Sequence, residues 1–233
     1  IGSGPTAPDP TTFRDASEIV ARYGVARTIP ASVRRYLAAG LKIDAPETPK
    51  PGATLFRRVD HILIGDNRAA VDAVNEAAKR EKLRTLVLAT SLTGEARELA
   101  KFFGAMAREI AGQGRPIRRP CCVIAGGEPT VTVRGQGTGG RAQEFALAAA
   151  AEIVGLKQIW VVGFATDGTD GPTTVAGAVV DGQTVAHAQR RKQSLARALR
   201  ENDAHAFFHA LRGHIVTGPT GTNVNDLYLL LAL

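Results

Sequence analysis

The sequence predicts an α/β protein. A Rossmann-like partial domain with a parallel sheet is expected over residues 1–115, and a smaller mixed α/β domain over residues 116–233. The first observation is that apolar runs alternate with helical patterns before residue 115, the signature of βαβ units. The second is a linker rich in Gly, Pro and Arg at 113–120. The third is that two short strand patterns follow the linker in close succession.

The first part opens with helical periodicity that is punctuated by glycine and proline. Glycines at 24 and 40 end two short helices, and three prolines mark 42–54 as an extended connection. A strand–helix–strand–helix alternation then follows. The expected helices are 13–23, 31–39, 68–80 and 95–111, and the expected strands are 61–64 (HILI) and 85–89 (TLVLA).

The second part shows the same two signals, short apolar runs and helical spacing. A helix without internal Gly or Pro begins at Arg141, directly after a glycine-rich stretch. The expected strands are 121–125, 130–133, 159–165, 176–180 and 227–233, and the expected helices are 141–154, 184–200 and 205–211.

Charge and composition exclude several classes of protein. The net charge of +7 is spread along the chain and aromatic residues make up 5%, which argues against a nucleic-acid binder and suits an enzyme of anionic substrates. No apolar run approaches the ~18 residues of a membrane helix. Adjacent Cys121 and Cys122 form no metal-ligand pattern and read as strand residues in a reducing compartment. We expect a cytoplasmic protein with no membrane partner.

The glycine-rich loop before Arg141 is the sharpest candidate site. Its glycines allow backbone N–H groups to approach an anion, and the helix that follows adds partial positive charge. The Arg141 guanidinium is placed to grip a phosphate. The loop is neither a Walker A motif nor a clean GxGxxG, and a flexible connection explains it equally well. Glu128 is a further candidate, as an acid or as a partner for Arg141.

Two further polar loops follow strand patterns, where ligands of α/β sheets bind. Asp167 and Asp170 in TDGTDGP can hold Mg²⁺ or orient a hydroxyl, although Asp-Gly turns also form for structural reasons alone. Residues 217–226 (TGPTGTNVND) are dense in hydroxyl and amide groups. These groups suit hydroxyl or phosphate recognition, or they satisfy their own backbone.

Four segments together resemble a known family. They are 1–12 (IGSGPTAPDPTT), 125–143 (AGGEPTVTVRGQGTGGRAQ), 166–180 (TDGTDGPTTVAGAVV) and 216–227 (VTGPTGTNVNDL). In this order they resemble the type-2 glycerate kinases, a family that also carries the label hydroxypyruvate reductase. The part from about residue 118 resembles its MOFRL domain. The resemblance implies phosphorylation of D-glycerate at the 2-hydroxyl, with ATP and a divalent metal such as Mg²⁺.

The resemblance also implies roles for individual residues. Arg141 matches the arginine taken as catalytic in the family, and we assign Asp167 to the substrate hydroxyl and Asp170 to the metal. Ala142 stands where the family usually has Asn. The expected substrate- and nucleotide-binding residues are Ser3, Gly4, Thr6, Gly137, Gly139, Gly140, Thr169, Thr220, Thr222, Asn223, Asn225 and Asp226.

Members of the family are about twice as long and begin with a segment that this sequence lacks. We therefore expect the chain to correspond to the C-terminal half and to be inactive alone. We also expect a homodimer. Two alternatives stay open at this point. One is an NAD(P)H-dependent hydroxypyruvate reductase, against which the absence of a strand–GxGxxG–helix motif argues. The other is a non-catalytic nucleotide-binding fragment.

Overall fold

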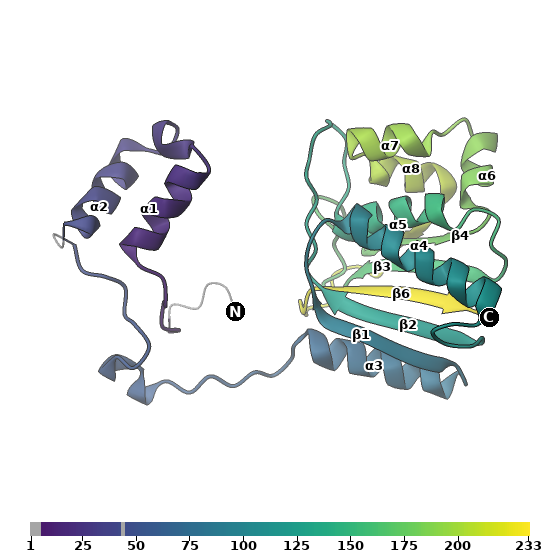
Figure 1. Cartoon of the computed structure of the whole chain (residues 1–233), viewed down its shortest axis with the longest axis horizontal. Helices are drawn as coiled ribbons and strands as arrows, with labels where there is room; N and C mark the ends of the chain where they lie inside the picture. The colour runs from purple at the N-terminus through teal and green to yellow at the C-terminus, as the bar shows by residue number, and fades with distance from the viewer. Residues whose placement is uncertain (1–5, 43–44) are drawn as a thin grey trace. The chain divides into compact units, whose positions relative to one another are not determined.

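A computed structural model describes residues 6–42 and 45–233 (Figure 1). The chain divides into two compact units, Ile1–Leu63 and Ile64–Leu233. The sequence analysis instead places a boundary after residue 115. Strands β1 (Arg84–Leu92) and β2 (Cys121–Gly127) flank that position and pair with each other in parallel.

The first unit is a pair of short helices, α1 (Phe13–Arg22) and α2 (Ala31–Leu41). Thr12 and Asp15 form a capping box that starts α1. Phe13 is buried against α2, where a Cβ on Gly40 would lie 2.2 Å from its ring. This unit also contains two 3₁₀ turns, η1 (Val25–Arg27) and η2 (Thr54–Arg58).

The second unit is built on one six-stranded sheet with the order β1-β2-β6-β3-β4-β5. Its further strands are β3 (Ile159–Ala165), β4 (Gly177–Asp181), β5 (His214–Ile215) and β6 (Asp226–Ala232). Every pairing except β1–β2 is antiparallel. The α/β class is confirmed, and the sheet is mixed.

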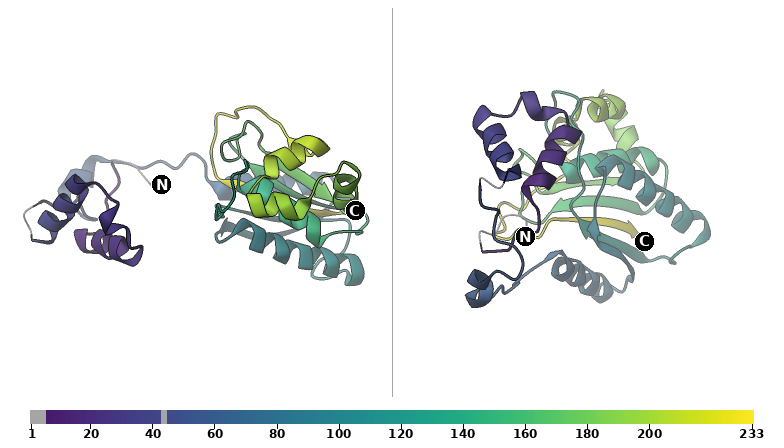
Figure 2. Two further views of the ribbon diagram at one scale, coloured as in Figure 1. Left: turned by 90° about the horizontal axis from the view of Figure 1, so that it is seen from above. Right: turned by 60° about the vertical axis from the view of Figure 1, so that its left-hand side comes forward.

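Helices cover the sheet on both sides, as Figures 1 and 2 show. Helix α3 (Asn67–Arg80) lies on one face, and α4 (Ala96–Gln113) and α5 (Arg141–Glu152) lie on the other. All positions of β2 are buried, as expected for a strand covered on both faces. The remaining helices are α6 (Thr184–Arg190), α7 (Leu195–Glu201) and α8 (Ala204–Leu211).

The core between α5 and the sheet fixes where α5 begins. Phe145 packs edge-on against Phe103 of α4, with ring centroids 5.1 Å apart, and against Tyr228 of β6, at 4.5 Å. A Cβ on Gly163 of β3 would lie 2.2 Å from the carbonyl oxygen of Ala142. Helix and sheet therefore touch backbone to backbone beside Arg141.

Three local predictions are wrong. Residues 61–64 are extended and exposed, with Ile64 97% exposed, and they pair with no strand among the described residues. An apolar run becomes a strand only where a neighbour satisfies its backbone. Residues 130–133 contribute a single bridge, from Thr130 to Glu95. The helix expected over 184–200 is split into α6 and α7 by a turn at Lys192, whose φ is +56°.

Neither unit contains, in its described part, a helix of the length and apolar character that crossing a bilayer requires.

Candidate functional site

The register of β6 gathers the polar loops at one edge of the sheet. Because β6 runs antiparallel to β2 and β3, its first residue, Asp226, lies opposite Gly127 at the end of β2 and Ala165 at the end of β3. The loops that leave β2 and β3 and the loop that enters β6 therefore meet. This is the carboxyl edge of β2 and β3, where ligands of α/β sheets bind.

Arg141 is the first residue of α5 and is held between two carboxylates. Its Nη1 lies 2.8 Å from Glu128 Oε1, and its Nε lies 3.0 Å from Asp226 Oδ2. The Arg141 side chain is 35% exposed, while that of Asp226 is 2% exposed. The guanidinium is thus fixed on its inner side and open to solvent on its outer side.

The Asp226 carboxyl is buried, and its pKa is raised. Burial raises its pKa to about 6, although the Arg141 charge and the Tyr228 hydroxyl act in the opposite direction. Tyr228 donates its hydroxyl proton to Asp226 Oδ2 at 2.9 Å. A carboxylate with both a cation and a hydroxyl donor in contact holds Arg141 in one orientation.

The glycine-rich loop, residues 135–140, is pinned along the junction of α7 and α8. Gly137 donates to the Glu201 carbonyl at 2.8 Å, and the Thr138 N–H donates to Asp203 Oδ1 at 3.2 Å. A Cβ on Gly135 would lie 2.2 Å from the Glu201 backbone. Glycine at these positions permits close packing of the loop against the α7–α8 junction. Among the described groups, the N–H donors of Gly139 and Gly140 have no acceptor.

Asp170 binds the first turn of α5. Its side chain accepts the N–H groups of Ala142 at 3.0 Å and of Gln143 at 2.8 Å, and also the Gln143 side-chain amide at 3.0 Å. The residue is 2% exposed. Burial raises the pKa of Asp170, and its hydrogen bonds with Gln143 and Ala142 oppose that rise. These contacts do not test the metal role expected for Asp170, which stays a prediction.

Asp167 has a different environment. Its Oδ1 accepts the Thr169 N–H at 2.9 Å, and its Oδ2 accepts the Asn223 side-chain amide at 3.2 Å. Its side chain is half-buried. Two neutral donors orient the Asp167 carboxylate and leave further lone pairs for another ligand.

The loops 166–172 and 217–226 are joined through Thr166, which the sequence analysis does not single out. Its hydroxyl donates to the Asn225 carbonyl at 2.7 Å and accepts the Val224 N–H at 2.9 Å. The Thr220 hydroxyl donates to the Thr166 carbonyl at 2.6 Å. The Thr220 hydroxyl also contacts the Thr222 carbonyl at 3.0 Å, and Asn223 Oδ1 accepts the Asn225 N–H at 3.0 Å. Much of the predicted polar set therefore orders the loop itself.

One cavity of about 570 Å³ opens between the glycine-rich loop, residues 135–140, and the loop 166–172. Six predicted site residues line it, and Glu144 and Asn202 line it without having been predicted. The predicted ones are Gly137, Gly139, Gly140, Arg141, Asp167 and Thr169.

Six predicted site residues of the second unit do not line this cavity: Asp170, Thr220, Thr222, Asn223, Asn225 and Asp226. The other three belong to the first unit. Ser3 and Gly4 fall outside the described residues. Thr6 belongs to the first unit, where its hydroxyl lies 3.4 Å from His61 Nε2. Within 6–42 and 45–233, no three His, Cys, Asp or Glu side chains are grouped to hold a metal.

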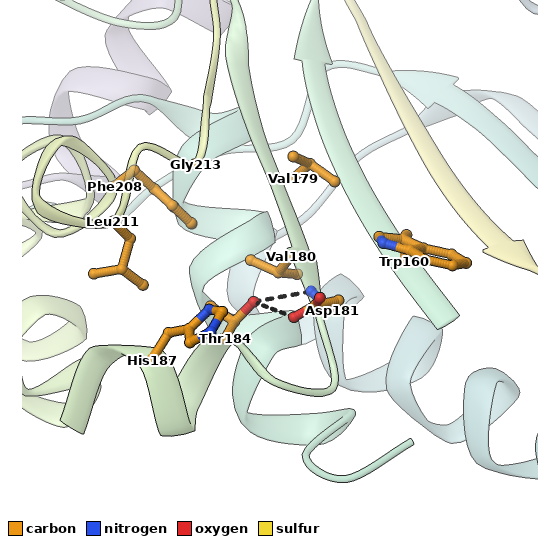
Figure 3. A pocket seen from close by; sticks show the side chains of 9 residues that line it. All are labelled: Trp160, Val179, Val180, Asp181, Thr184, His187, Phe208, Leu211 and Gly213. Carbon is orange, nitrogen blue, oxygen red and sulfur yellow. Dashed lines mark hydrogen bonds between the residues drawn. The ribbon is translucent and has the colours of Figure 1, made fainter. Parts of the chain in front are cut away.

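A second cavity, of about 190 Å³, lies beside β4 (Figure 3). Asp181 and Thr184 lie on its wall and hydrogen-bond each other at 2.9 Å. Trp160 and Phe208 supply apolar surface. Asp181 and Thr184 already engage each other, and this cavity is the smaller of the two, so the first cavity is the better candidate site.

The fold and the site together define an α/β protein with a polar sheet edge that carries Arg141. The sequence profile of the MOFRL family matches residues 121–226, and that of a domain of unknown function, DUF4147, matches residues 1–38. A glycerate 2-kinase of Pyrococcus horikoshii is 38% identical over 99% of this chain and 52% of its own length. A glycerate kinase of Macaca fascicularis is 30% identical over 99% of this chain and 67% of its own length.

Solved structures agree. The crystal structure of a glycerate kinase from Thermotoga maritima superposes with a TM-score of 0.81 at 36% identity, over all of this chain and 53% of that one. The chain belongs to the glycerate kinase family. It spans about half the length of the first curated relatives that it matches.

Proposed function

We propose that this chain supplies the phosphoryl-binding part of a glycerate kinase, which transfers the γ-phosphoryl group of ATP to the 2-hydroxyl of D-glycerate. The observation that carries the proposal is the shared cavity of Arg141, the glycine-rich loop and Asp167. The names of the relatives support the substrate. The basic charge of the chain suits two anionic substrates.

Arg141 acts on the transferring phosphoryl group. Negative charge on that group is stabilised by a cation held ready in place, which costs no reorganisation during the reaction. Asp226 and Glu128 hold the guanidinium through its Nε and Nη1 atoms, respectively. The exposed side of the guanidinium and the N–H groups of Gly139 and Gly140 bind phosphate oxygens at the start of α5.

Asp167 orients the glycerate hydroxyl. Its contacts with Thr169 and Asn223 fix the direction of the carboxylate. A hydroxyl that donates to Asp167 is aimed for in-line attack, and the carboxylate receives the proton as the new P–O bond forms.

A divalent metal fits this site as a nucleotide-bound ion. Mg²⁺ is commonly held by one or two carboxylates together with phosphate oxygens. Each Asp167 oxygen accepts a single N–H donor and keeps a lone pair for the ion, whereas Asp170 accepts three N–H donors and is 2% exposed. We therefore assign the metal contact to Asp167, where the ion would neutralise phosphate charge.

The test uses the protein expressed from the complete reading frame that encodes this chain. With D-glycerate and MgATP, we expect stoichiometric ADP and 2-phosphoglycerate, with the phosphate position assigned by ³¹P NMR. Arg141→Ala should lower kcat by roughly 10³-fold, as losing an arginine at a transferring phosphoryl does. Arg141→Lys, which keeps the charge but not the fork geometry, should retain intermediate activity.

Arg115→Ala is the matched control, because Arg115 is 72% exposed in an ion pair with Glu109. Turnover of Arg141→Ala within threefold of wild type would discard the role of Arg141. NADH consumption with hydroxypyruvate in place of ADP release would discard the kinase.

A further inference from the structure

Asn202 occupies a position that joins the glycine-rich loop to α5. It ends α7 in the left-handed conformation, with φ at +53°, and is 6% exposed. Its Oδ1 accepts the N–H groups of Arg134 at 2.8 Å and of Gly135 at 3.1 Å. Its Nδ2 donates to the two carboxylate oxygens of Glu144, at 3.1 and 3.3 Å.

The negative charge of Glu144 is compensated by donors on neighbouring elements. It lies in the first turn of α5, and its side chain is 3% exposed. Arg97 of α4 forms an ion pair with it, its Nε lying 2.9 Å from Oε1, and also donates to the Leu199 carbonyl at 3.2 Å. A buried carboxylate without such partners would be strongly destabilising, so Glu144 fixes the surrounding groups in place.

We propose that Asn202 and Glu144 are positioning residues, which set the distance between the glycine-rich loop and Arg141. Their effect on catalysis rests on the proposed function. Glu144 lies three positions after Arg141 in α5, and Gly135 begins the loop whose glycines line the same cavity. The Asn202 amide bridges the two elements because one end accepts from the loop and the other donates to the carboxylate.

The chemistry of the bridge explains why an amide is needed. Aspartate at 202 would still accept the two loop N–H groups but would place a second carboxylate against Glu144. Two like charges in a buried site repel strongly. Exchanging the two functional groups, with Gln at 144 and Asp at 202, restores a donor facing an acceptor.

The test is a double-mutant cycle of Asn202→Asp and Glu144→Gln. We expect Asn202→Asp alone to lower kcat about 10- to 100-fold, since a displacement of about 1 Å in a catalytic site has that effect. Adding Glu144→Gln should recover at least tenfold. Amide hydrogen exchange over residues 134–140, measured on the 233-residue chain, should rise in the single variant and return toward wild type in the double variant.

Glu98→Gln is the control, because Glu98 lies on the exposed face of α4 in a surface ion pair. Far-ultraviolet circular dichroism and thermal unfolding monitor folding in each variant. An unfolded Asn202→Asp variant whose double partner folds also supports the bridge. A double variant no better than Asn202→Asp, in exchange or in folding, overturns it. Recovery of exchange protection in a protein without kinase activity would overturn the proposed function and leave the bridge standing.

Discussion

His214 shows how packing changes the chemistry of a single side chain. Its ring stacks on that of His205 with centroids 4.6 Å apart, and its Nε2 is buried without a hydrogen-bond partner in the described chain. Burial, together with the nearby charges of His205 and His209, lowers the pKa of His214 to about 4. The neutral imidazole is therefore the form that the fold accepts.

This shift makes stability depend on pH. Because the folded protein resists protonating His214, the unfolded chain binds more protons between pH 6.5 and 4, and stability falls as the pH falls through that window. We expect His214→Gln to remove about 1–2 kcal/mol of that loss, the partial exposure of the ring limiting the figure. Urea unfolding at pH 7 and pH 4.5 measures it, with His187→Gln as control. Equal losses in His214→Gln and wild type would contradict the assignment.

At the scale of elements, the seating of α5 on the sheet places the start of the helix. Gly163 of β3 leaves room for the Ala142 carbonyl, which a Cβ would approach to 2.2 Å. Asp170 holds the same turn through its N–H groups, and Asn202 holds it through the Glu144 side chain. The position of Arg141 is therefore the outcome of several non-local contacts.

Gly163→Ala should disturb both stability and site. Since the atom that a Cβ would meet is backbone, the helix must move, at a cost of about 1–3 kcal/mol. Gly112→Ala is the matched control, because Gly112 is an exposed residue of α4 and a Cβ built on it would meet no atom within 4 Å. Alanine there should stabilise the folded protein by about 0.5–1 kcal/mol. Thermal unfolding compares the two. A Gly163→Ala variant as stable as wild type would show that α5 is not held so closely.

At the scale of the whole molecule, the sheet crosses the predicted boundary at 115. Helix α4 and β1 precede it, yet Phe103 packs on Phe145 and β1 pairs with β2. Residues 116–233 alone would expose that apolar surface, which a folded unit avoids.

Limited proteolysis of the 233-residue chain should therefore cleave between residues 45 and 64 and leave a stable fragment that starts near residue 64. In parallel, residues 116–233 produced alone should show no cooperative thermal transition, whereas residues 64–233 should. Cooperative unfolding of 116–233 at the midpoint of the longer piece would instead support the boundary after residue 115.

Local pattern accounts for the elements that form. The run at 159–165 matches β3, and the expected helices at 68–80, 95–111 and 141–154 match α3, α4 and α5 within a few residues. The spacing of apolar residues that predicts each of these elements extends over only a few neighbouring positions. Residues 61–64 carry an equally apolar pattern without becoming a strand, because strand formation also needs a neighbour that the pattern does not specify.

The candidate site divides in the same way. Arg141, Asp167 and the glycines at 137, 139 and 140 were identifiable from residue type and from their place after strand patterns. Asn202 was not, since its importance lies in a contact with Glu144, 58 residues away. Asn67 is a similar case, donating to the Val224 and Asp226 carbonyls across the sheet.

The amino-acid sequence by itself determined the α/β class, the family and the three loops that carry polar chemistry, because side-chain type and short-range periodicity set these. The tertiary structure decided that β6 lies between β2 and β3, that Asp170 caps α5, and that Asn202 bridges the loop to the helix. The physical reason is that hydrogen-bond partners and strand neighbours are chosen by packing between segments distant in the chain, where the energy of a contact depends on what all its neighbours bury together.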